Sequence, residues 1–128
     1  MKNLEQIRAR NALEAMEKYP DIHKGQEGGN ALTGFPALIV ANGLLAAMAF
    51  SLSLKNGGGH EQICDAIAAH LADPDIGLVH LPAKSARGLL DVLTKSDSSV
   101  LRLCTAEALA FLNYLRRFVK AGKHGDRS

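Results

Sequence analysis

The chain has 128 residues, which limits it to one domain of ordinary size. Apolar residues make up 47% and charged residues 22%, so global disorder is excluded, and the abundance of Leu and Ala favours helices. The net charge of +2 is too small, over the whole chain, to indicate binding to nucleic acid or a membrane. Two cysteines 40 positions apart, Cys64 and Cys104, exclude a disulfide scaffold. Together with a charged N-terminus that lacks an apolar signal core, they predict a cytoplasmic protein.

Helical spacing of apolar residues dominates the chain, and no segment alternates convincingly as a strand does. The predicted helices cover residues 4–19, 30–35, 36–55, 60–72, 84–94 and 98–121. Asn3 and Gln6 have the spacing of a capping box before the first helix, and Gly122 is expected to end the last one. The prediction is an all-α, single-domain bundle of five to six helices over residues 1–128, with a flexible tail at 122–128.

One long segment, residues 28–54, carries no charged side chain and has the length of a membrane span. It is flanked by Glu27 and Lys55 rather than by the cluster of positive charge that is typical beside a span. A helix that is apolar all round also suits the centre of a bundle. We therefore expect a central bundle helix and no membrane association, with Pro36 in the first turn and a close helix crossing at Gly43.

The sequence shows few signs of catalysis. The glycine run 57–59 is not followed by Lys and Ser or Thr, as a phosphate-binding loop requires, and no G-x-S-x-G elbow occurs. His60 and Cys64, four residues apart, could bind a metal as a pair, but structural zinc takes four ligands and no second pair is evident. Both cysteines are interpreted as buried thiols. Glu107 could be a general acid, and an ion pair is its expected role. We predict no catalytic residue, metal or cofactor; the alternative is a small helical metal-dependent phosphohydrolase.

Charge is distributed unevenly. Residues 100–128 hold six Lys and Arg against two acids, residues 21–99 hold five against eight, and residues 1–20 hold four against three, giving +4, −3 and +1. The cations of the last helix lie largely on the side opposite its apolar residues. We call them the basic face: Arg102, Arg116, Arg117, Lys120 and Lys123. Such a row suits RNA phosphates, and a solvated helix end that complements the helix dipole is the alternative. Further candidates for phosphate contact are Arg8, Arg10, Lys84 and Arg87.

Three segments together resemble a known family: LEQIRARNALEAM near the start, FPALIVANGLLAAMAF in the middle and TAEALAFLNYLRRFVKA near the end. In this order they are similar to the small subunit of the type III-B CRISPR effector, the Cmr RAMP-module complex. The resemblance implies an all-helical, non-catalytic subunit of an RNA-guided antiviral complex. Copies of the subunit are expected to stack into a filament beside the backbone subunits, within a complex that also has large subunits. Together they would line the groove that holds guide RNA and target RNA.

The basic part of the family's C-terminal motif is matched by Arg116, Arg117 and Lys120. The resemblance therefore favours RNA contact over a merely solvated helix end. Three places depart from the family pattern. Tyr114 stands where members often have Trp, and Val100 lies where an aromatic residue is frequent. Gly34 and Phe35 precede the central proline, where many members carry a basic residue, so no RNA contact is predicted there.

Overall fold

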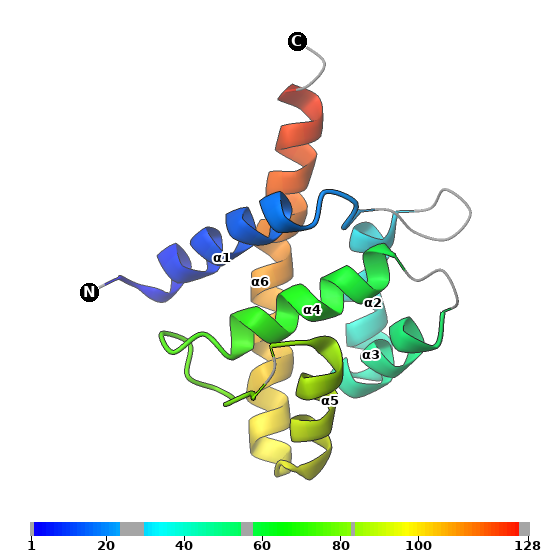
Figure 1. Ribbon diagram of the computed structural model, residues 1–128, viewed down its shortest axis with the longest axis vertical. Coiled ribbons are helices and arrows are strands. Elements are labelled where there is room, and N and C mark those ends of the chain that lie inside the picture. The colour runs from blue at the N-terminus through cyan, green and yellow to red at the C-terminus, as the bar shows by residue number, and fades with distance from the viewer. Residues whose placement is uncertain (1, 24–29, 55–57, 83, 126–128) are drawn as a thin grey trace.

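The computed structural model describes residues 2–23, 30–54, 58–82 and 84–125. Within these ranges the chain forms six helices and no strand, which confirms the predicted all-α, single-domain bundle. The helices are α1 (Leu4–Lys18), α2 (Ala31–Asn42), α3 (Leu44–Ser53), α4 (Gly59–Leu71), α5 (Ala86–Lys95) and α6 (Ser98–Gly125). The long helix α6 spans the molecule, α1, α2 and α4 pack against it, and its C-terminal end projects beyond them (Figure 1).

Polar side chains begin several of these helices. Asn3 accepts the backbone N–H of Gln6 at 2.9 Å, and the Gln6 side chain accepts the backbone N–H of Asn3 at 2.9 Å, so the predicted capping box is confirmed. The side chains of Asn30 and Ser85 cap α2 and α5 by accepting the backbone N–H of Thr33 and of Gly88, each at 3.1 Å. These bonds satisfy N–H groups that have no partner inside the helix, and they fix where each helix starts.

The prediction of one continuous helix over 36–55 is wrong. The apolar segment forms α2 and α3, which meet at Gly43 with φ of 88° and ψ of 161°, a conformation open almost only to glycine. A Cβ atom built at Gly43 would have no atom within 4 Å, so the expected close helix crossing is also wrong. Pro36 lies inside α2 rather than in a first turn. None of the described helices is long and apolar enough to cross a membrane.

The last helix is longer than its sequence predicted. It passes Gly122 and continues to Gly125, while the remainder of the predicted tail, residues 126–128, lies outside the described residues. A Cβ at Gly122 would lie 3.7 Å from Met16 Sδ, an ordinary packing distance. The neighbouring residue of α1 therefore leaves room for the helix to continue past this glycine.

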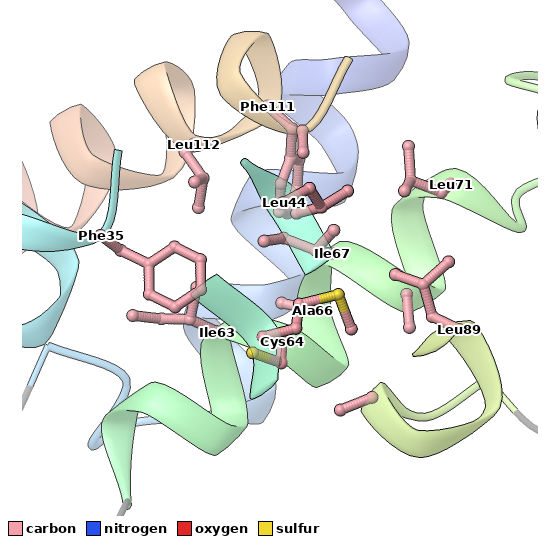
Figure 2. Packing of buried hydrophobic residues seen from close by; sticks show 14 of the residues in the cluster. Phe35, Leu44, Ile63, Cys64, Ala66, Ile67, Leu71, Leu89, Phe111 and Leu112 are labelled. Atoms are coloured by element: carbon pink, nitrogen blue, oxygen red, sulfur yellow. The ribbon is translucent and has the colours of Figure 1, made fainter. Parts of the chain in front are cut away.

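Helix α4 lies at the centre of the core. It packs against α1, α2, α3, α5 and α6, and most of its residues are buried. Figure 2 shows side chains from five helices converging there: Phe35, Leu44, Ile63, Ile67, Leu71, Leu89, Phe111 and Leu112. Burial of these apolar side chains supplies the main stabilisation of the bundle. Because α6 gives one face to this core along much of its length, its opposite face is left to solvent.

Two glycine substitutions test the bend between α2 and α3. Gly43→Ala should lower the free energy of unfolding by about 1–3 kcal/mol, because alanine is strained at this φ and ψ. The matched control is Gly34→Ala, inside α2, where a Cβ also meets nothing within 4 Å and φ is not positive. It should raise the free energy of unfolding by about 0.5–1 kcal/mol. Urea unfolding of both variants measures the difference, and an unchanged or stabilised Gly43→Ala protein contradicts the backbone argument.

Candidate nucleic-acid interface

The basic face lies on the solvent side of α6. Arg102, Arg116, Arg117 and Lys120 are exposed, whereas the opposite side of the helix is buried against the core. Lys123 belongs to α6, but its side chain lies outside the part of the chain whose surroundings are described. The placement follows from the helical period, because apolar residues at steps of three and four fix which side of the helix turns inward. Exposure of the four described cations therefore agrees with the sequence prediction.

The structure groups three of these cations and separates the fourth. Arg116, Arg117 and Lys120 occupy little more than one turn near the projecting end of α6. Arg102 lies 14 residues earlier, about 21 Å along the helix axis at 1.5 Å per residue. Hydrogen bonds from Ser99 and the Val100 amide, with a contribution from Arg102, hold the pKa of Asp97 below its usual value. The positive charge of Arg102 is thus partly offset by a neighbouring carboxylate.

The acid of α6, Glu107, does not share the basic face. Its side chain points into the bundle, where Arg8 of α1 donates two hydrogen bonds to its carboxylate, of 2.7 and 2.8 Å. His70 of α4 lies 2.9 Å from the same carboxylate. Burial opposes ionisation of Glu107, but the bonds from Arg8 and His70 outweigh it, so the pKa of Glu107 is lowered. The ion pair that the sequence suggested for Glu107 is confirmed.

Arg8 and Arg10 are both engaged by carboxylates of the fold. Arg8 is held by Glu107, and Arg10 lies 2.6 Å from Asp73 and 3.6 Å from Asp75, beyond the end of α4. Both guanidinium groups are therefore balanced by carboxylates within the fold, and we remove them from the predicted phosphate contacts. Two other predicted candidates are exposed: Lys84 just before α5 and Arg87 in its first turn.

Sequence reasoning missed a polar cluster beneath the crossing of α1 and α6. His70 is buried, with ring nitrogens 2.9 Å from Asn11 and 2.9 Å from Glu107. Asn11 also donates to Asp73 at 2.9 Å. One sequence signal was available: His70 lies at steps of seven and three residues from the apolar Ile63 and Ile67, on the inward side of α4. A polar residue at such a position requires buried partners.

The pair His60 and Cys64 has surroundings that disfavour metal binding. The His60 ring lies beside two aromatic rings, with centroids 6.3 Å from that of Phe35 and 6.1 Å from that of Phe50. Burial raises the pKa of the Cys64 thiol to about 12, and a thiol must lose its proton to bind zinc. In the described parts of the chain, no three His, Cys, Asp or Glu residues stand close enough to hold a metal ion. Cys64 and Cys104 are both buried thiols, as predicted.

Comparison with known proteins decides the family. The family model for CRISPR-associated protein (Cas_Cmr5) matches residues 4–122, from the start of α1 to the last turns of α6. The chain belongs to the Cmr5 family. It is a small subunit of the type III-B CRISPR Cmr complex, and its partners are other subunits of that complex. No curated protein and no solved structure gave a significant match.

For this Cmr5 family member, the match covers the part of the chain that carries the basic face. Arg102, Arg116, Arg117 and Lys120 fall inside it, whereas Lys123 lies one residue beyond its end. The buried partners Arg8, His70 and Glu107 fall inside it as well. The exposed cations and the inward-turned acid therefore belong to the same structural unit.

Removal of the buried carboxylate should be costly. Glu107→Ala leaves the Arg8 guanidinium without its partner, and we expect the free energy of unfolding to fall by about 3 kcal/mol. The control is Asp91→Ala, which removes an exposed i,i+4 pair with Lys95 and should cost less than about 0.5 kcal/mol. Urea unfolding at neutral pH compares the two. Equal losses in both variants would contradict a structural role for Glu107.

Proposed function

We propose that this Cmr subunit holds the phosphate backbone of guide or target RNA along the basic face and does not read the bases. The observation that carries the proposal is the separation of charges on α6. The four cations whose surroundings are described, Arg102, Arg116, Arg117 and Lys120, are exposed. The acid of the same helix, Glu107, is turned into the bundle and neutralised by Arg8. A row of solvent-exposed cations binds a polyanion by releasing its counterions, and such contacts are independent of base sequence.

Base stacking is the less favoured mode of contact. Tyr114 and Phe118 lie on α6 near the cations, but both rings are half-buried and their centroids are 6.1 Å apart in a tilted arrangement. The Tyr114 hydroxyl donates a 2.8 Å hydrogen bond to Glu5 of α1. Single-strand binders that stack bases need open aromatic faces, whereas these two rings pack against the apolar core.

Protein neighbours have several apolar places to dock. Val40 of α2 is 74% exposed, Leu103 of α6 57% and Phe50 of α3 47%. In our proposal these faces contact the backbone and large subunits of the complex and further copies of the chain. A contact between two different faces of identical subunits repeats as a filament unless its rotation closes a ring. The proposed setting is antiviral defence in the cytoplasm.

We also propose that the subunit is not an enzyme. The interior groups that could do acid–base or nucleophilic chemistry are committed to the fold. Glu107 is ion-paired with Arg8, His70 is hydrogen-bonded on both ring nitrogens, and burial raises the pKa of Cys64. The isolated protein should hydrolyse neither RNA nor a generic phosphodiester in Mn²⁺ or Zn²⁺. Metal-dependent turnover, together with stoichiometric metal in chelator-free protein, would revive the phosphohydrolase alternative.

Charge reversal tests the RNA contact. A triple variant, Arg116→Glu, Arg117→Glu and Lys120→Glu, should lower retention of target RNA by the assembled complex by about tenfold or more. For three lost contacts to single-stranded RNA, the slope of log affinity against log salt should shrink by about 2. Filter binding at several salt concentrations measures both quantities. Thermal melting of the isolated subunit should be almost unchanged, because all three side chains are exposed.

The matched control reverses three cations elsewhere. Lys2→Glu, Lys18→Glu and Lys95→Glu change the net charge by the same amount at exposed sites outside α6. RNA retention by this variant should stay at the wild-type level. Unchanged retention in the α6 variant at low and moderate salt contradicts the proposal. Equal losses in both variants would indicate a general charge effect and would also contradict it.

A further inference from the structure

His70 joins three helices through a side chain that has no solvent exposure. It belongs to α4, its Nδ1 lies 2.9 Å from Asn11 Nδ2 of α1, and its Nε2 lies 2.9 Å from Glu107 Oε2 of α6. The ring also stacks on Phe111 of α6, with centroids 4.4 Å apart and planes at 16°. The position of α1 against α4 therefore depends on a titratable ring that is held from both ends.

The partners assign the proton of this ring. The Asn11 amide nitrogen also donates to Asp73 at 2.9 Å, and the Asn11 oxygen accepts a 3.2 Å bond from Arg10 Nε. These two bonds fix the amide so that its NH₂ group faces His70 Nδ1. Nδ1 must then be an acceptor, and Nε2 carries the hydrogen that is donated to Glu107. Rotation of the Asn11 amide would lose both outer bonds.

The charges around the ring are already balanced without a proton on it. Glu107 of α6 is paired with Arg8 of α1, and Asp73 and Asp75 beyond the end of α4 are paired with Arg10 of α1. Farther out, the groove between α1 and α4 is also lined by three charged side chains, Glu14, Lys18 and Lys84. Burial dominates the attraction of Glu107, so the pKa of His70 is lowered from its usual value of 6.5.

Water has a short route to this ring. A groove of about 190 Å³ runs between α1 and α4, and its lining includes Asn11, His70 and Asp73. Three alanines, Ala15, Ala66 and Ala69, also line it, so only short side chains stand beside the hydrogen-bonded cluster there. A proton can therefore reach the cluster by a local opening of the two helices, and unfolding of the whole bundle is not required.

We propose that His70 is a proton-sensitive latch for α1. Protonation of Nδ1 sets an N–H group against the NH₂ group of Asn11, and the C-terminal half of α1 separates from α4 while the rest of the bundle stays folded. Arg10 and Asn11 lose their fixed places against Asp73 in the opened state. The proposal concerns the packing of α1 and is independent of RNA binding by α6.

The direction of the pH effect follows from linkage. The His70 pKa is lower in the folded than in the unfolded chain, so the unfolded or opened form takes up the proton first. The stabilisation of the closed latch is complete above about pH 6.5 and is lost progressively as the pH falls below that value. Hydrogen bonds to Glu107 and Asp73 outweigh burial and lower the pKa of each carboxyl. The stability that these two carboxylates contribute is therefore lost only at lower pH, as they become protonated.

Hydrogen exchange of the full chain between about pH 7.5 and about pH 5 tests the latch. After correction for intrinsic rates, exchange of residues 11–18 should rise by up to about tenfold per pH unit across the acid part of this range, as expected for one linked proton. Exchange in α5 and in the central turns of α6 should change much less. A flat profile for residues 11–18, or an equal rise in every described helix, overturns the proposal.

Two variants sharpen the result. His70→Gln removes the titrating ring and should abolish the acid response of residues 11–18, whereas His80→Gln, at an exposed loop histidine, should leave it intact. A response that survives in His70→Gln overturns the latch. Should that variant fail to fold, ring ¹⁵N shifts of wild-type His70 decide the matter. The latch requires the Nε2–H form at neutral pH and a midpoint below 6.5 that coincides with opening of α1; the other tautomer or a separate midpoint overturns it.

Discussion

A carboxylate inside a helical bundle must have its charge balanced where it lies, because water is no longer there to solvate it. Glu107 imposes this condition on three helices at once. Arg8 neutralises it from α1, His70 donates to it from α4, and α6 carries it inward. The same arrangement keeps this negative charge off the outer side of α6. The inward direction of the Glu107 side chain thus has two consequences: a charge-balanced cluster inside the bundle and an outer side of α6 that is positive.

The sequence predicted much of the fold because most helices have a clear apolar period and polar caps. Helices α1, α4, α5 and α6 were expected close to their observed ranges for this reason. The segment that became α2 and α3 is apolar on nearly all sides, so periodicity could not reveal a break within it. The bend depends on one residue, Gly43, whose positive φ is a property of the folded backbone. A glycine in a helical pattern can mark a packing contact or a turn, and the sequence alone does not distinguish them.

The sequence predicted the exposed part of the candidate interface but not the ion pairs beneath it. Exposure of Arg116, Arg117 and Lys120 follows from their positions relative to the buried residues of the same helix, which is local information. The ion pairs of Arg8 and Arg10 cannot be read from local sequence. Their partners Glu107 and Asp73 are 99 and 63 residues away, so their charge balance appears only when the helices are assembled. The Asn11–His70 contact was missed for the same reason.

The outer face of α6 is largely uncoupled from the core. Its exposed cations project away from the buried side of the helix, and the hydrogen bond of 3.4 Å that Arg117 donates to Asn113 is made on the surface. Lysine and arginine can therefore replace one another there, or move by one turn, at little cost to folding. Such exchanges keep the summed charge of the basic face and leave the interior of the bundle unchanged. The interior tolerates less, because Arg8 and His70 are both bonded to Glu107 and a change at one of the three side chains removes a bond from another.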